Sequence, residues 1–205
     1  MEQRTNEWFS ERAGKFTGSR FADLMAVNKR TGEPTAAFWD CVWQVVAERI
    51  SGQPIVSSGG IATRWGADVE PYAREAYEMD SGNLVTEVGF IPHPAFPFAG
   101  ISPDGLIGED GGVEFKAPKN EIVHLQRFLD GVPEEYRPQC QGAMWVTGRK
   151  WWDFVSYDPR QSTEFQLLRI RINRDEAFIA NLQACVLRAE EEASKLIEKL
   201  RKSIS

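Results

Sequence analysis

The segment SPDGLIGEDGGVEFKAP, residues 102–118, constrains the fold of this 205-residue chain more than any other. Short apolar runs on either side of the EDGG sequence predict two strands joined by a turn. Side chains two positions apart on a strand share a face, so Glu114 and Lys116 are expected to point the same way. If the strands pair through the turn, Asp104 comes near Glu114. The segment therefore predicts a hairpin that gathers two carboxylates and a lysine.

Two carboxylates held this close repel each other unless a cation lies between them or one takes up a proton. Mg²⁺ or Mn²⁺ suits such a pair, because these hard ions accept carboxylates, waters and phosphate oxygens as ligands. The backbone carbonyl of Phe115 could supply a further oxygen. A bound metal would lower the pKa of Lys116 and let it act on a water. The pattern alone leaves open an ordinary cross-strand ion pair between Glu114 and Lys116 on a solvated face.

The charge distribution supports an acidic site within a chain of net charge −6. Residues 51–120 contain 4 basic and 10 acidic side chains, whereas residues 1–50 carry 7 of each and residues 121–205 carry 13 of each. The acidic excess thus lies in the region of the predicted hairpin. Residues 12–30 form a locally basic strip in which only Asp23 is acidic. The average charge therefore hides one acidic and one basic region.

The number and spacing of the cysteines and histidines limit the kinds of disulfide and metal site that the chain can form. The three cysteines, Cys41, Cys140 and Cys185, are widely spaced, which predicts neither a disulfide framework nor an iron–sulfur cluster. The two histidines complete no Cys/His zinc spacing. The polar start lacks the apolar centre of a signal peptide, and no apolar run is long enough to cross a membrane. We therefore expect a protein of the reducing cytoplasm with no membrane partner.

The order of predicted elements indicates a mixed α/β or α+β fold in a single domain of residues 1–205. N-terminal helices are expected within 1–81, a catalytic sheet core at 84–172 and a C-terminal helix at 174–202 that packs on the sheet. Pro71 predicts an irregular helix beside it, and Pro138 is unusual inside a helix. Within these regions we expect helices at 16–27, 35–50, 61–79, 119–130 and 134–147, and strands at 84–92, 98–101, 105–108, 112–117, 151–157 and 164–172.

Four motifs, in order along most of the chain, resemble the phage-type alkaline exonucleases, the lambda exonuclease and YqaJ-like group of the PD-(D/E)xK nucleases. EWFSERAGKFTGSRFADLM is similar to the N-terminal helix pair of that family, and GADVEPYAREAYE to its G-x(3)-E helix. ISPDGLI and VEFKAP resemble its catalytic strands, and YRPQCQGAMWVTGRKWWDFVSYDPR its glutamine helix and following strand. The resemblance implies a restriction-endonuclease-like core, with a central mixed β-sheet flanked by helices.

The resemblance also implies a role for each matched residue of the catalytic core. Asp104, Glu114 and the Phe115 carbonyl would hold a metal ion. Glu70 would hold a second metal ion or its waters. Lys116 would activate or orient the attacking water.

A second group of matched residues would contact the substrate. Gln139 would orient the nucleophilic water or a phosphate. Arg12 and Ser19 would bind a terminal 5′-phosphate, which suits the bidentate guanidinium and the positive end of a helix. Ser102 would also touch phosphate. Thr17 or Ser19 can equally act as a helix cap, and this role is compatible with phosphate binding.

As a whole, the resemblance implies a Mg²⁺-dependent 5′-to-3′ exonuclease, with Mn²⁺ as a substitute and two ions per active site. It would digest linear double-stranded DNA and leave 3′ single-stranded tails for phage-type recombination. The implied assembly is a homotrimeric ring around DNA, and the implied partner is a single-strand annealing protein. The implied setting is a phage or prophage gene in a bacterial host cell.

Other functions remain open from the sequence. A structure-specific or non-specific DNA endonuclease would use the same core without needing an end, although Arg12 and Ser19 favour end recognition. A non-catalytic DNA-binding module would not need the complete set of core residues that the chain retains. A glycosidase based on Asp104 and Glu114 would leave Lys116 without a role.

Overall fold

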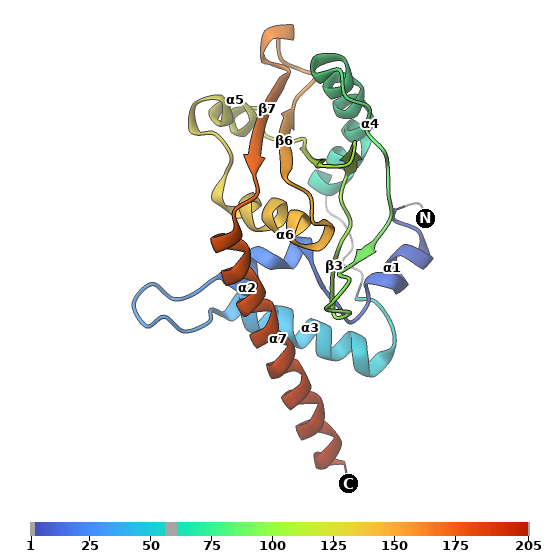
Figure 1. The fold of residues 1–205 in the computed structure, drawn as a ribbon, viewed down its shortest axis with the longest axis vertical. Helices are drawn as coiled ribbons and strands as arrows, with labels where there is room; N and C mark the ends of the chain where they lie inside the picture. Colours follow the sequence, from blue (N-terminus) through green and yellow to red (C-terminus); the bar gives the residue numbers. More distant parts are fainter. Residues whose placement is uncertain (1–2, 56–60, 205) are drawn as a thin grey trace.

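Two small sheets organise the chain in this computed structural model, which describes residues 3–55 and 61–204 (Figure 1). The first sheet has the strand order β1-β3-β2, with β1 (Phe16–Thr17), β3 (Ala99–Ile101) and β2 (Ile91–Pro92). The second has the order β4-β5-β6-β7, with β4 (Gly105–Ile107), β5 (Gly111–Lys116), β6 (Trp151–Tyr157) and β7 (Leu167–Asn173). Both sheets mix parallel and antiparallel pairs. The expected mixed α/β fold is confirmed, but two sheets replace the single central one.

The hairpin of β4 and β5 forms as the sequence predicts. Antiparallel pairing aligns Gly105 with Val113. Glycine is required at Gly112, because a Cβ there would approach the ring of Trp152 in β6 to 2.3 Å. Beyond the hairpin pairing, β5 continues in parallel with β6 alone. The last residues of β5 therefore have one free edge, next to the link from β3 to β4.

Helices cover both faces of the second sheet. α4 (Ile61–Ser81) packs on one face, whereas α5 (Glu121–Asp130) and α6 (Arg137–Thr147) pack against β6 from the other. Neighbouring residues of a strand alternate between faces. Phe115 accordingly belongs to the core under α4, and Glu114 points toward α6.

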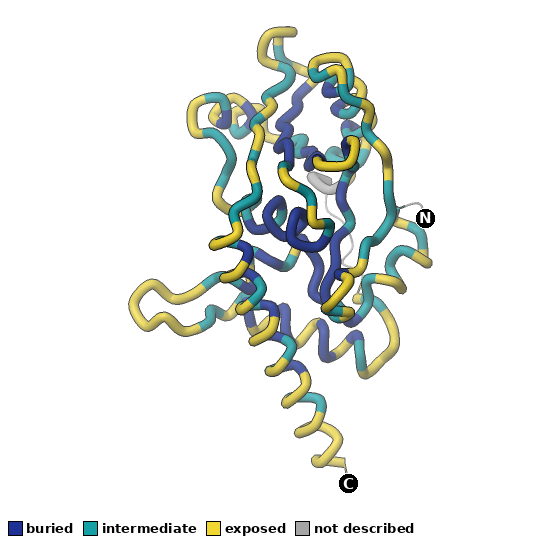
Figure 2. The backbone as a smooth tube through the Cα atoms, viewed as in Figure 1, coloured by how far each residue is buried: buried dark blue, intermediate teal, exposed yellow. Residues whose placement is uncertain are grey.

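A second core lies between helices. It is formed by α2 (Phe21–Met25), α3 (Ala36–Ser51), α6 and α7 (Glu176–Ser203). The apolar stripe of α7 was expected to pack on the sheet, but it packs against α2, α3 and α6. Figure 2 shows that the C-terminal half of α7 is largely exposed. In the part of the chain that is described, no helix is both long enough and apolar enough to span a membrane.

Several predicted elements differ from those in the structure. The strand expected at 84–92 is reduced to β2, while Thr86 adds an isolated bridge to Leu106. The helix expected at 16–27 begins instead with β1, which pairs with β3, so the N-terminal region is not wholly helical. The remaining elements are α1 (Asn6–Arg12) and the 3₁₀ turns η1 (Gly18–Arg20), η2 (Glu134–Tyr136) and η3 (Thr163–Phe165).

Two prolines that were expected to disturb helices are accommodated. Pro71 lies inside α4, which continues to Ser81, so the irregularity predicted beside Glu70 does not end the helix. Pro138 occupies the first turn of α6. A missing N–H costs little there, because the first N–H groups of a helix have no partner within it. Pro138 therefore allows α6 to direct Gln139 toward the sheet.

Candidate active site

Asp104, Glu114 and Lys116 come together at the free edge of β5. Oδ2 of Asp104 accepts a hydrogen bond of 2.7 Å from the backbone N–H of Phe115. Nζ of Lys116 donates to Oε1 of Glu114, and Nε2 of Gln139 donates to the same oxygen at 2.6 Å. The side chain of Glu114 is only 4% exposed. This contact is therefore buried and linked to α6, unlike an ion pair on a solvated face.

The charges of the cluster shift two of its pKa values. Burial raises the pKa of Asp104 well above its usual value, and the nearby carboxylates of Glu114 and Glu70 raise it further. Burial disfavours the charged form of Lys116, but Glu114 and Asp104 outweigh burial and raise the pKa of Lys116. The lower pKa of Lys116 that is expected from the sequence depends on a neighbouring metal ion. The protein groups by themselves keep Lys116 as an ammonium.

The donors at this edge fit a Mg²⁺ ion. Mg²⁺ is usually held by one or two carboxylates, and waters or phosphate oxygens complete its shell. The N–H and carbonyl of a strand residue point to the same side, so the Phe115 carbonyl faces the edge where its N–H meets Asp104. Among residues 3–55 and 61–204, no three His, Cys, Asp or Glu side chains form a metal site by themselves. Asp104, Glu114 and the Phe115 carbonyl would therefore need water or substrate oxygens to complete the shell.

Glu70 reaches the same region from α4. It lines a cavity of about 260 Å³ together with Asp104 and Lys116. Oε2 of Glu70 accepts a hydrogen bond of 2.8 Å from Nη2 of Arg4, and Nη2 of Arg74 lies 3.9 Å from its Oε1. Two arginines therefore balance the charge of Glu70, and its role toward a second metal ion remains a prediction.

A second pocket lies beside the carboxylates. Nη1 of Arg12 donates a hydrogen bond of 2.7 Å to Oγ of Ser102, and Nη2 donates one of 3.3 Å to Oγ1 of Thr17. Oγ of Ser19 lies 3.4 Å from the same Thr17 oxygen. The guanidinium of Arg12 stacks over the ring of Trp8, 4.2 Å from its centre. Neither Thr17 nor Ser19 caps a helix through its side chain, so the predicted cap is absent.

The charge of Arg12 makes this second pocket attractive to an anion. Burial and the neighbouring Arg20 lower the pKa of Arg12 to about 10. Arg20 forms an ion pair with Glu48 at 2.9 Å, but Arg12 forms none within the described part of the chain. One cavity of about 200 Å³ is lined by Arg12 and by the Asp104 cluster. An anion bound to Arg12 would therefore lie next to the carboxylates.

Sequence reasoning missed three residues of this region. Nε1 of Trp8 donates a hydrogen bond of 2.9 Å to Oγ of Ser102. Nζ of Lys116 lies over the ring of Tyr136, 5.0 Å from its centre. Arg4 contacts the site from the residues before α1. The position of Trp8, four residues before the predicted phosphate-binding arginine, is a signal that could have found it. Tyr136 opens the segment that resembles the glutamine helix of the family, whereas no local pattern indicates Arg4.

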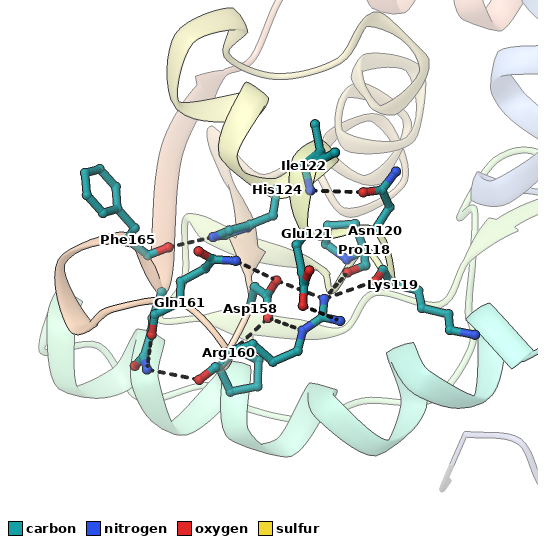
Figure 3. A network of polar contacts seen from close by, with 12 residues as sticks. Pro118, Lys119, Asn120, Glu121, Ile122, His124, Asp158, Arg160, Gln161 and Phe165 are labelled. Carbon is teal, nitrogen blue, oxygen red and sulfur yellow. Dashed lines mark hydrogen bonds and ion pairs between the residues drawn. The ribbon is translucent and has the colours of Figure 1, made fainter.

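A polar network holds the loop that follows β5 (Figure 3). Arg160, in the turn after β6, donates to the two carboxylate oxygens of Asp158 at 2.8 and 2.9 Å. Its Nη2 also donates to the backbone carbonyls of Pro118 and Lys119, at 3.4 and 3.1 Å. The guanidinium lies 4.6 Å from the centre of the Trp65 ring in α4. Arg160 thus links the loop after β5 to α4, the helix that carries Glu70.

The chain is similar to a known family and to several solved structures. Residues 7–150 match the family model of the YqaJ-like viral recombinase domain. The crystal structure of the alkaline exonuclease LHK-Exo from Laribacter hongkongensis is similar with a TM-score of 0.88 and 38% sequence identity, over 98% of each chain. The crystal structure of LHK-Exo in complex with dAMP is similar with a TM-score of 0.89 and 38% sequence identity, again over 98% of each chain. A phage-related exonuclease from Haemophilus somnus 129PT shares the fold, with a TM-score of 0.73 and 16% identity over 91% of this chain and 96% of that one. No curated protein sequence matches the chain.

Proposed function

Because the chain belongs to the YqaJ-like viral recombinase family, we propose that it is a Mg²⁺-dependent DNA exonuclease that digests linear duplexes from their 5′ ends. A relative with 38% identity over nearly the whole length is an alkaline exonuclease, which supports nuclease activity. The crystal structure of that relative with dAMP supports a nucleotide substrate. Polarity, metal dependence and substrate form are our own inference for this chain.

One observation carries the proposal, namely the cavity that a half-buried arginine, Arg12, shares with the half-buried Asp104 and the buried Glu114. Arg12 has two N–H groups on hydroxyl oxygens and can offer its charge to a terminal phosphate. Asp104 and Glu114 line the same cavity. A strand whose 5′-phosphate binds Arg12 would bring its next phosphodiester toward the carboxylates. This arrangement favours digestion from an end over cleavage at internal positions.

The residues of the chain divide the chemistry between them. Bound Mg²⁺ would polarise the scissile phosphate and lower the pKa of a coordinated water. Asp104, Glu114 and the Phe115 carbonyl would hold it. The ammonium of Lys116, fixed by Glu114, would orient the attacking water or offset charge that develops on the phosphate. Gln139 would keep the Glu114 carboxylate in position through its hydrogen bond.

The proposal extends to the products and the assembly. Removal of one strand from its 5′ end would leave a 3′ single-stranded tail, which a single-strand annealing protein would take up. A closed homotrimeric ring would keep a protein of net charge −6 on DNA through topology rather than through bulk positive charge.

The test compares three DNA substrates with wild-type protein and two variants. The substrates are a linear duplex with 5′-phosphate ends, the same duplex with 5′-hydroxyl ends and a covalently closed circle. The variants are Lys116→Ala and, as a matched control, Lys199→Ala, which removes an exposed lysine of α7. Each reaction is run with Mg²⁺ and with a chelator.

We expect Mg²⁺-dependent loss of the phosphorylated linear strand from its 5′ end, with the circle intact. Lys116→Ala is expected to abolish this activity and Lys199→Ala to retain it. Cutting of the closed circle would instead identify an endonuclease. Binding of DNA without cutting would identify a non-catalytic module.

A further inference from the structure

Gln3 and Arg4, which precede α1, lie beside the active site and contact it through their side chains. Nε2 of Gln3 donates to the carbonyl of Val88 at 3.0 Å and to the carbonyl of Pro103 at 2.7 Å. Pro103 directly precedes Asp104. The next residue, Arg4, donates from Nη2 to Oε2 of Glu70 at 2.8 Å. The side chain of Gln3 therefore ties the segment just before α1 to the link between β3 and β4, which carries Asp104.

Arg4 has an unusual backbone conformation. Its φ of +68° is the one left-handed value of a non-glycine residue within the described part of the chain. Arginine has no preference for this region, which is unfavourable for residues with a Cβ. Such outliers persist where surrounding contacts impose them, and they concentrate at functional sites. The two hydrogen bonds of Gln3 and the hydrogen bond of Arg4 to Glu70 lie on either side of this backbone turn.

The guanidinium of Arg4 is placed between the two halves of the site. It lines the cavity of Glu70, Asp104 and Lys116, and it also lines the cavity that joins Arg12 to the carboxylates. Its side chain is 56% exposed, and its hydrogen bond to Glu70 engages one of five guanidinium donors. Arg4 can therefore accept a second partner that enters from solvent.

Glu70 does not depend on Arg4 alone. Nη2 of Arg74 lies 3.9 Å from the other carboxylate oxygen of Glu70, so this residue keeps a cationic neighbour when Arg4 moves. A DNA strand held at Arg12 by its 5′-phosphate would bring its next phosphodiester to the carboxylates, where Arg4 lines the same cavities. This phosphate offers the guanidinium a stronger acceptor than water.

We propose that Arg4 binds the phosphodiester that lies beside the carboxylates when the 5′-phosphate occupies the Arg12 pocket, and that its contact with Glu70 is the resting position of the side chain. This inference rests on the proposed function. It adds a substrate-binding residue from a segment outside the four motifs of the sequence.

The test measures DNA binding in the presence of a chelator, so that no strand is cut. A labelled duplex with a 5′-phosphate end is titrated at several salt concentrations with wild type, Arg4→Gln, Glu70→Gln and the double variant Arg4→Gln/Glu70→Gln. Lys199→Gln serves as the control for the loss of one positive charge. Thermal melting of each variant verifies that it is folded, which the exposure of Arg4 favours.

Arg4→Gln is expected to weaken binding about tenfold and to reduce the slope of log affinity against log salt by about 0.9, the loss of one phosphate contact. Lys199→Gln is expected to change neither the affinity nor the slope. If Arg4 contacts DNA, the double variant also binds less tightly than Glu70→Gln, with the same reduction in slope.

Two results would overturn the inference. Equal affinity and slope for wild type and Arg4→Gln would exclude a phosphate contact. Equal affinity for Glu70→Gln and the double variant would show that Arg4 acts only by neutralising Glu70. Failure of wild type both to bind the duplex and to digest it with Mg²⁺ would instead contradict the proposed function, which separates the two ideas.

Discussion

The carboxylate of Asp104 accepts a 2.7 Å hydrogen bond from the backbone N–H of Phe115, one residue after Glu114. This contact joins the start of the β4–β5 hairpin to its end at the point where strand pairing stops. It holds the two carboxylates close together, where burial and the charge of Glu114 raise the pKa of Asp104 and outweigh the hydrogen bond from Phe115, which lowers it. The arrangement is unfavourable for the protein alone and suits the binding of a cation.

Asp104→Asn is therefore expected to stabilise the metal-free protein. A carboxyl pKa that is higher in the folded state reduces stability above that pKa, and the cost disappears below the unfolded value of about 3.9. In chelator at pH 8, we expect the variant to gain about 1 kcal/mol in the free energy of unfolding, since Asn keeps an acceptor for Phe115. Urea unfolding at pH 8 and pH 3 checks this. A loss of stability at pH 8 would mean that the charged hydrogen bond outweighs the repulsion.

Arg12→Lys is expected to reduce discrimination between the two kinds of DNA end. A lysine retains the charge but not the two-pronged contact of a guanidinium with phosphate. We expect KM for the duplex with 5′-phosphate ends to rise about tenfold, which corresponds to about 1.4 kcal/mol. KM for the 5′-hydroxyl duplex serves as the internal control and should change little. A parallel rise for both ends would place Arg12 away from the terminal phosphate.

Tyr136→Leu is expected to lower kcat, because Lys116 would lose the aromatic ring on which its ammonium lies. A partly desolvated contact of this kind is worth about 1–2 kcal/mol, or roughly a tenfold change in rate. Tyr136→Phe keeps the ring and is expected to retain activity within about threefold. Single-turnover digestion of the phosphorylated duplex measures both variants. An equal loss in both would assign the effect to the hydroxyl group instead.

Asp158→Asn is expected to destabilise the protein in a pH-dependent way. Burial would raise the pKa of Asp158, but hydrogen bonds from Arg160 outweigh burial and lower it. A lowered folded pKa gives stability that is complete above about pH 4 and is lost as the pH falls through the folded value. We expect the variant to lose about 1–2 kcal/mol at pH 7 and to match wild type near pH 2. A constant difference at all pH values would show that charge is not the cause.

The local parts of the site could be predicted from the sequence, because they depend on short-range geometry. Alternation along a strand places Glu114 and Lys116 on one face, and the turn brings Asp104 to them. Asp104, Glu114, Lys116 and Gln139 do come together, although their roles are still to be tested. Gln139 directly follows Pro138, which the sequence marks as unusual inside a helix. The structure puts that proline in the first turn, where it is harmless.

Other features depend on long-range packing and could not be predicted. The stripe on α7 shows that one face is buried, but periodicity does not tell a sheet from other helices as the partner. The division into two sheets arises because β1, from the N-terminal region, pairs with β3. Arg4 reaches Glu70 across 66 positions of sequence. No short motif can indicate a contact over such a separation.

Ser102 and Asp104 lie on the link between the two sheets, with only Pro103 between them. Ser102 belongs to the Arg12 pocket, and Asp104 belongs to the carboxylate pair with Glu114. Two residues of extended chain span at most about 7 Å, close to the repeat of a nucleic-acid strand. Pro103, the single residue between them, limits the distance between Ser102 and Asp104 along the backbone. The distance from the bound 5′-phosphate to the phosphodiester that is cut would thus be set by backbone length. This length changes little with thermal motion or with the sequence of the substrate.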